Sequence, residues 1–365
     1  MRLTTWSRTT SAAIATAMTG ALLATAPAAT GTSAEASSPA APTLTGARGL
    51  DVAPGGRVVV AQADGRYGVL VRKGEHKGRF RKLGEVGPGF IAPALDVNDA
   101  GAVFVLTTGG EGRAAYSLYR WTRRDGQVKI ARVRGYQRED TDPYDLEDKP
   151  GESNPYGVAA LGDGSALVAD AANNDLLRVR PNGKIYTVAR FKPRMVEVPE
   201  GLGPDAPPAG TVMPSESVPT SVTVGADGAM YVGELRGFPA TPGTSQVWRI
   251  RPGARNAVCD PEKPNKGPCR LHADGFTSIV ALQTGRGGSL YVTELSKLGW
   301  LMMEDPNAGP EAMIGSVIRV GHDTDVRREL GAGKVIAPGD VAVRPGGAVL
   351  VSTPIFGPSK VMRLN

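Results

Sequence analysis

The sequence has few of the residues on which most nucleophilic and zinc-dependent active sites rely. Its 365 residues include two cysteines, three histidines and only 5% aromatic residues. There is no Gly-x-Ser-x-Gly motif to present a reactive serine, and the histidines, His76, His272 and His322, are far apart in the chain. A Ser-His-Asp triad is therefore not expected.

Helix-period apolar stripes are also missing after the N-terminal region. The chain instead contains 48 glycines and 29 prolines, which fits a protein with many turns. We therefore expect very little helix and no transmembrane segment in the mature chain.

The charge pattern does not favour a nucleic-acid partner. The formal net charge is +6, but no basic block is interleaved with aromatic residues, as nucleic-acid binders require. The densest basic stretch, residues 120–124, is interpreted as a strand that runs into its turn.

The N-terminal region has the pattern of a secretory signal. Arg2 and Arg8 precede an Ala-rich apolar run at residues 11–24, and small residues at 26–28 or 34–36 offer cleavage sites. The apolar run is too short and too Ala-rich for a good membrane span, although an uncleaved anchor is the alternative. We therefore expect a secreted, extracellular protein.

These features divide the chain into three parts. Residues 1–36 are predicted to be the signal peptide and cleavage region, and residues 37–41 a disordered leader whose composition is too polar to form a core. Residues 42–365 are predicted to form one folded domain.

The two cysteines, Cys259 and Cys269, bracket a Pro- and Lys-rich loop. In an exported chain such a pair favours a disulfide, which would stabilise the fold by about 2–3 kcal/mol. A zinc site with the nearby His272 is the alternative, but three ligands in such a loop make a poor site.

One short pattern recurs six times: an apolar strand, a turn with glycine, and a second apolar strand that ends in valine. Each copy predicts a β-hairpin. The copies occupy residues 50–60, 95–105, 158–168, 222–232, 280–292 and 341–351.

A second motif, two apolar residues followed by arginine, comes after every hairpin and predicts a third strand. A fourth strand is indicated at residues 127–133 and 184–191. Four-stranded units of this length are typical of a β-propeller. The prediction is thus an all-β, six-bladed β-propeller; a pair of β-sandwiches is the alternative. Because the last unit ends one strand short, residues 42–46 are expected to close the ring by strand exchange.

A polar residue stands two positions after the closing valine of every hairpin. Since this position faces the channel mouth in propellers, we expect the side chains to gather there. The six residues are Gln62, Thr107, Asp170, Glu234, Glu294 and Thr353.

Three of these residues, Asp170, Glu234 and Glu294, come from consecutive units. Converging carboxylates require a cation, and oxygen ligands favour Ca²⁺ or Mg²⁺. They form the metal-site hypothesis, with Asn154, Asn173 and Asn174 as further oxygen ligands. The alternative is that each acid binds backbone N–H groups of its own loop or pairs with an arginine. No cofactor is certain.

Candidate ligand contacts lie in the segments that enter the strands or follow the second strand of a unit. The entry segments also have a structural interpretation as tight turns, and asparagine suits left-handed turn positions. The Pro- and Gly-rich insertion at residues 190–217 is interpreted as a solvated loop, with a lid over the channel as the alternative. The ligand candidates are Asn154, Tyr156, Asn173, Asn174, Thr220, Phe238 and Thr277.

Several segments resemble a known family closely. They read SNPYG, LVADAANNDLLRV, VPTSVTVGADGAMYVGELRGFP, DGFTSIVAL and GGSLYVTEL, and lie between residues 153 and 295. They resemble the ScyD/ScyE family of secreted propellers, which is related to the NHL-repeat and gluconolactonase-like groups. The family itself implies no catalytic mechanism. Its gluconolactonase-like relatives hold a divalent cation with carboxylates and asparagine, which implies comparable parts for Asp170, Glu234, Glu294 and Asn154.

Two main hypotheses for function follow. The first is a binding or scaffold protein that uses the channel face to hold a small molecule, or an extracellular polymer or protein. The second is a divalent-metal-dependent hydrolase or lactonase with carboxylates from the third to fifth units. A purely structural envelope protein is a third interpretation.

Overall fold

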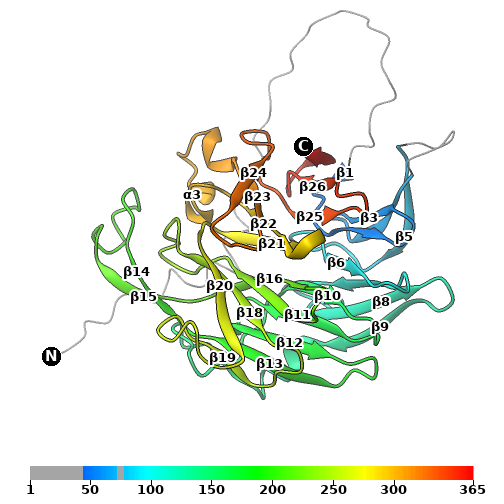
Figure 1. The fold of residues 1–365 in the computed structure, drawn as a ribbon, viewed down its shortest axis with the longest axis horizontal. Coiled ribbons are helices and arrows are strands. Elements are labelled where there is room, and N and C mark those ends of the chain that lie inside the picture. Colours follow the sequence, from blue (N-terminus) through cyan, green and yellow to red (C-terminus); the bar gives the residue numbers. More distant parts are fainter. Residues whose placement is uncertain (1–43, 72–77, 365) are drawn as a thin grey trace, which may run out of the picture.

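A computed structural model describes residues 44–71 and 78–364 of the chain. The predicted signal region (1–36) and leader (37–41) lie outside the described residues, as does His76. The described part contains six antiparallel sheets arranged around a centre (Figure 1). The predicted all-β, six-bladed propeller is therefore confirmed.

Each blade is a meander in which the first strand is innermost. Blade 1 contains β2 (Leu50–Ala53), β3 (Arg57–Ala61), β4 (Arg66–Leu70) and β5 (Phe80–Glu85). Blade 2 contains β6 (Ala94–Val97), β7 (Val103–Leu106), β8 (Ser117–Thr122) and β9 (Gly126–Arg132). Blade 3 contains β10 (Pro155–Ala160), β11 (Ala166–Asp170), β12 (Asp175–Val179) and β13 (Ile185–Phe191).

The remaining three blades follow the same plan. Blade 4 contains β16 (Pro219–Val224), β17 (Met230–Glu234), β18 (Ser245–Ile250) and β20 (Cys269–Phe276). Blade 5 contains β21 (Ile279–Thr284), β22 (Leu290–Glu294), β23 (Ser316–Val320) and β24 (Arg327–Leu330). Blade 6 contains β25 (Asp340–Val343), β26 (Val349–Thr353) and β27 (Pro358–Leu364).

The N-terminal strand closes the ring. β1 (Leu44–Thr45) pairs antiparallel with β27 and supplies the outer strand that blade 6 lacks. The N–H of Ala47 also donates to Ser359 Oγ at 2.9 Å. Strand exchange is thus confirmed, and the two ends of the propeller hold each other in place.

Two features depart from six simple blades. β19 (Ala257–Cys259), from the connection between β18 and β20, adds to the rim of blade 3 in parallel with β13. The predicted disulfide is present, and Cys259 is bonded to Cys269 at the start of β20. This bond ties the added strand on blade 3 to blade 4.

The insertion between β13 and β16 is more ordered than the expected solvated loop. It forms a two-stranded ribbon of β14 (Arg194–Glu197) and β15 (Val212–Ser215). Figure 1 shows this ribbon at the periphery, away from the inner strands, and not over the channel as a lid would be. Arg194 Nη1 fixes it to blade 4 by an ion pair with Asp274 at 2.8 Å.

In residues 44–71 and 78–364, helices are few and short, as expected. They are α2 (Val133–Gln137), η2 (Arg286–Gly288), α3 (Trp300–Glu304) and η3 (Pro310–Met313). Among the described residues, none of the helices has the length and apolar character needed to span a membrane.

The apolar core fills the spaces between neighbouring blades. One cluster packs Leu167 and Leu176 of blade 3 against Trp248 and Ile250 of blade 4. Such face-to-face packing buries both sides of every sheet, because the period-2 pattern of each strand places one apolar row on each side.

The two faces of the disc differ. Because each blade is a meander, one face carries the loops between the second and third strands and the connections to the next blade. We call it the insertion face, since segments 133–154, 192–218, 235–244 and 295–315 all belong to it. The opposite face, with the short hairpins, is called the underside.

Candidate functional site

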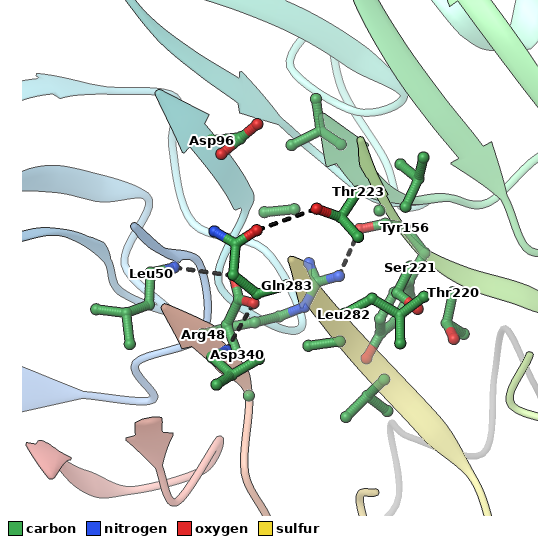
Figure 2. Close-up of a pocket in the computed structure, with 18 of the residues that line it drawn as sticks. Arg48, Leu50, Asp96, Tyr156, Thr220, Ser221, Thr223, Leu282, Gln283 and Asp340 are labelled. Atoms are coloured by element: carbon green, nitrogen blue, oxygen red, sulfur yellow. Dashed lines mark hydrogen bonds between the residues drawn. The ribbon is translucent and has the colours of Figure 1, made fainter. Parts of the chain in front are cut away.

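The centre of the propeller is a narrow polar channel lined by the inner strands. Its cavity volume is about 40 Å³. Figure 2 shows Arg48, Asp340, Gln283 and Thr223 around this space. A buried water needs roughly 10–15 Å³, whereas ligand pockets usually measure some hundreds of Å³. The channel therefore has room for a few waters and not for a sugar-sized molecule.

Arg48 closes the channel on the insertion face. Its guanidinium lies 3.8 Å from the centre of the Tyr156 ring. It donates to the carbonyl oxygen of Ala92 at 3.1 Å and to that of Tyr156 at 2.5 Å. The side chain is buried, so these contacts hold a permanent positive charge between blades 1, 2 and 3.

Three carboxylates lie beyond Arg48, on the inner strands of blades 6, 1 and 2: Asp51 is buried, and Asp340 and Asp96 are half-buried. Burial raises the pKa of Asp340 to about 7 and that of Asp51 above its usual value. The pKa of Asp96 is raised well above normal by burial and by the charge of Asp51. A proton shared between Asp51 and Asp96 is the arrangement that such a pair favours.

Gln283 completes the polar lining from the opposite side. Thr223 Oγ1 donates to Gln283 Oε1 at 3.0 Å (Figure 2). Gln283 Nε2 donates to Asp51 Oδ1 at 3.5 Å. The polar side chains that line the channel are thus hydrogen-bonded to one another, which indicates a structural role.

The predicted metal ligands lie at the insertion face, each at the entrance of its own blade. Asp170 is fully buried and accepts from Ser153 Oγ at 2.6 Å and from the N–H of Asn154 at 2.5 Å. Asn154 in turn accepts from the N–H of Gly109 through Oδ1 at 3.2 Å. Burial raises the pKa of Asp170 in spite of these donors.

Glu234 holds the entrance of blade 4 in the same way. Its Oε1 accepts from Ser217 Oγ and Trp248 Nε1, both at 2.6 Å. Its Oε2 pairs with Arg236, and both side chains of this ion pair are almost completely buried. The carboxylate is therefore neutralised by the protein itself.

Glu294 accepts hydrogen bonds at the entrance of blade 5 in the same way. Its Oε1 accepts from the N–H of Thr277 at 2.7 Å and its Oε2 from Ser316 Oγ at 2.6 Å. The structure thus places the three acids in separate blade entrances. Across residues 44–71 and 78–364, no group of three or more His, Cys, Asp or Glu side chains is placed to hold a metal ion. The metal site at Asp170, Glu234 and Glu294 stays a prediction.

The other three positions of the predicted polar ring also bind loop backbone. Gln62 Oε1 accepts from the N–H of Thr45 at 3.1 Å. The Oγ1 atoms of Thr107 and Thr353 donate to the carbonyl oxygens of Ala114 and Ile336. In all six blades the side chain at this position therefore forms a hydrogen bond with a neighbouring segment.

Asn173 and Asn174 lie in the turn between β11 and β12. Asn174 has a φ of +48°, the left-handed conformation that asparagine tolerates. It donates to Asp142 Oδ2 at 3.0 Å and accepts from the N–H of Val218 at 2.8 Å. Asn173 donates to the carbonyl oxygens of Pro150 and Glu152. Both side chains thus organise the connections on either side of blade 3.

The remaining ligand candidates are mostly inside the fold. Tyr156 carries Arg48 on its ring, and Thr220 Oγ1 donates to the carbonyl oxygen of Ile279 at 2.5 Å. Thr277 Oγ1 accepts from the N–H of Gly243 at 2.9 Å. Phe238, next to the cis Pro239, is half-buried on the insertion face, so among these four residues it is the most available to a ligand.

The comparisons with known proteins agree with the fold. No family model matches the sequence, and no curated protein matches it either. A gluconolactonase from Xanthomonas campestris is similar in structure, with a TM-score of 0.52 and 12% identity over 88% of this chain and 87% of that one. A glucose dehydrogenase gives a TM-score of 0.54 and 13% identity over 88% and 97% of the two chains. A Bacteroides thetaiotaomicron protein of unknown function gives 0.54 and 12%, over 89% and 71%.

These neighbours show the propeller fold. At such low identity they show nothing of the activity. Membership of the ScyD/ScyE family stays a prediction.

The channel carboxylates were missed by the sequence analysis, although two of them left a signal. Asp51 and Asp96 occupy the same place in the first two hairpins, directly after the leucine that pairs with the closing valine. A charged residue inside an apolar strand, repeated in register, indicates a side chain with a buried partner. Arg48 left no comparable signal, because no repeat places an arginine there.

A second buried acid beside Asp170 was also missed. Gln137 Nε2 donates to Asp170 Oδ2 at 3.1 Å and to Asp175 Oδ1 at 3.0 Å. Among the residues that the structure describes, Asp175 Oδ2 and Gln137 Oε1 find no hydrogen-bond partner, and both side chains are fully buried. The pKa of Asp175 is raised well above normal by burial and by the charge of Asp170. A protonated Asp175 is the form that this environment favours, because its O–H supplies a donor where none is present.

Proposed function

We propose that the protein is an exported binding protein that recognises its partner on the insertion face. Two observations support this. The central channel has a cavity volume of only about 40 Å³, and the carboxylates of Asp170, Glu234 and Glu294 already accept hydrogen bonds from the protein. Four of the long segments of the propeller belong to the insertion face, whereas residues 251–268 leave on the underside. Loops on a rigid scaffold commonly carry recognition.

The distribution of exposed apolar side chains is the observation that carries the proposal. Nine large apolar side chains are exposed among the described residues, and six of them lie in segments of the insertion face. A bias of exposed apolar side chains toward one face supports an interaction site on that face. The six are Phe90, Leu146, Met195, Val212, Leu298 and Ile336.

Export is part of the proposal. The Cys259–Cys269 disulfide supports it, since disulfides persist in oxidising compartments. The expected partner is consequently an extracellular or envelope component.

The hydrolase hypothesis receives less support from the site. A catalytic divalent cation needs carboxylates with free oxygen atoms, but Glu234 already pairs with buried Arg236 and accepts two further hydrogen bonds. Moving it to a cation would leave Arg236 as an uncompensated buried charge, which is costly.

Photo-cross-linking tests the proposal. A photoreactive phenylalanine analogue replaces Leu146 on the insertion face or, as the matched control, Val326 on the underside; both positions are exposed. We expect a saturable adduct with an envelope component from position 146 and none from position 326. Equal adducts from the two positions, or none from either, would overturn the proposal.

A further inference from the structure

A cavity lies at the underside between blades 6 and 1, where the ring closes. Its volume is about 250 Å³, whereas the central channel measures about 40 Å³. An apolar cavity of about 150 Å³ is already large enough to hold benzene. The space between these two blades, which we call the seam cavity, can therefore hold the apolar part of a small molecule.

The floor of the seam cavity is apolar. Blade 1 contributes Val58 and Leu70, which stand opposite each other in neighbouring strands, and blade 6 contributes Leu350 and Val361. All four belong to the apolar cluster between the two blades. Leu70 and Val361 are only half-buried, however. The contact between the blades is thus incomplete at this end, and an apolar ligand would remove further apolar surface from water.

Two arginines form the rim of the seam cavity. Arg344 begins the turn between β25 and β26, and Arg363 lies near the end of β27. Arg344 is half-buried and Arg363 is exposed. In the part of the chain that the structure describes, neither guanidinium forms an ion pair. The rim therefore carries two positive charges that a ligand can neutralise.

The sequence repeat explains why the rim arginine of β27 has no acidic partner. It is the last copy of the motif of two apolar residues and arginine. In blades 3 and 4 the arginine of this motif pairs with the acid directly before the turn glycine, Arg178 with Asp163 at 2.5 Å and Arg249 with Asp227 at 2.6 Å. In blade 6 the residue at this position is Gly346. The chain thus omits the internal counter-ion at the blade that borders the cavity.

We propose that the seam cavity binds a small amphiphilic carboxylate, whose apolar chain lies on the floor residues and whose head group lies between Arg344 and Arg363. The planar guanidinium of arginine matches a carboxylate through two parallel N–H donors. A cationic head group would instead meet two like charges. The inference goes beyond the proposed function, because the seam cavity lies at the opposite side of the disc from the insertion face.

Isothermal titration calorimetry with sodium octanoate tests the proposal on the mature protein. We expect saturable binding of one octanoate per chain. From butanoate to hexanoate the affinity should rise about fourfold for each methylene, since each buried methylene adds apolar contact. Octylammonium chloride should show no saturable binding. The inference is wrong if octanoate does not bind, or if octylammonium binds as tightly as octanoate.

Matched variants test the head-group contact. Arg344→Gln with Arg363→Gln should weaken octanoate binding about tenfold or more, because hydrogen bonds to a charged group are lost. The control, Arg286→Gln with Arg319→Gln, removes the same charge from exposed positions on the turn and third strand of blade 5. We expect the control to bind octanoate like the parent protein. An equal loss in both double variants, or no loss in the first, would show that octanoate is not held by the rim arginines.

Ala348→Leu tests the place of the apolar chain. Ala348 lines the seam cavity, so a leucine side chain at this position occupies space that the ligand needs while both rim arginines remain. We expect octanoate affinity to fall about tenfold or more in a variant that urea unfolding shows to be folded. Unchanged affinity would place octanoate elsewhere and overturn the inference. Octanoate should not affect cross-linking from position 146, so the two proposals can fail independently.

Discussion

Asp51 Oδ2 in blade 1 accepts a hydrogen bond of 2.9 Å from the N–H of Val97 in blade 2. The inner strand of a blade has one edge without a neighbouring strand, and its N–H groups point into the channel. A buried N–H without an acceptor is costly, so the carboxylate of one blade supplies the acceptor for the next.

The same contact recurs around the channel. Asp340 Oδ2 of blade 6 accepts from the N–H of Leu50 at 3.0 Å, and Asp96 Oδ2 of blade 2 from the N–H of Ala160 at 2.6 Å. Thr223 Oγ1 of blade 4 accepts from the N–H of Thr284 at 3.4 Å. These side chains join successive blades at the centre, which explains why acids line a channel that is too narrow for a ligand.

Asp340 should make the stability of the fold depend on pH. Its pKa in the folded state is about 7, above the usual value of 3.8, so the folded state binds the proton more tightly than the unfolded state. Stability is then greatest below about pH 4 for this group and falls as the pH rises to about 7. In urea unfolding, Asp340→Asn should reduce the loss of stability between pH 5 and 8 by about 2–3 kcal/mol. Asp325→Asn, an exposed control, should leave it unchanged; an identical change in both variants would show that Asp340 is not the group.

Arg48 should matter for stability without any ligand. Arg48→Met keeps the apolar stem but leaves the carbonyl oxygens of Ala92 and Tyr156 without their donors. Since each unsatisfied buried group costs about 1–3 kcal/mol, we expect a loss of about 2–4 kcal/mol by urea unfolding, and a smaller loss for Arg48→Lys. If Arg48→Met were as stable as the parent protein, the hydrogen bonds of Arg48 to Ala92 and Tyr156 would not stabilise the fold.

The blades could be predicted because their signals are local. Each hairpin combines a period-2 apolar pattern with a turn glycine, and Gly101, Gly164 and Gly228 do have φ values of +79°, +79° and +76°. Closure could be predicted as well, since a last unit that lacks one strand leaves an unpaired edge for residues near Leu44.

The site could be predicted only in part, because sequence position does not give direction. Asp170, Glu234 and Glu294 hold equivalent positions in successive blades, but each accepts hydrogen bonds from donors of its own blade. The pairing of β19 with β13 was missed for a different reason. A three-residue parallel strand has no periodicity to detect, and its partner lies more than sixty residues away.

A variant of Glu234 distinguishes a structural role of the three acids from the metal-site hypothesis. Glu234→Gln leaves Arg236 buried without its counter-charge, and breaking such a pair costs about 3–5 kcal/mol. We expect the same loss in EDTA and in excess Ca²⁺ or Mg²⁺, measured by thermal unfolding. Glu294→Gln should cost less, because within the described part of the chain Glu294 accepts from Thr277 and Ser316 and from no buried arginine. A cation-specific stabilisation of the parent protein that Glu234→Gln abolishes would revive the metal site.

The disulfide should protect the rim between blades 3 and 4 and not the centre. β19 has only three residues, and its parallel pairing with Ala189–Phe191 gives it few hydrogen bonds of its own. Cys259, the last residue of β19, is bonded to Cys269 and closes the short loop that follows this strand. Replacing both by serine should lower the free energy of unfolding by about 2–3 kcal/mol. Hydrogen exchange should speed up in β19 and along the outer edge of β13, while β10 and β16 at the channel exchange as before. Faster exchange throughout all six blades would instead mean that the bond supports the ring as a whole.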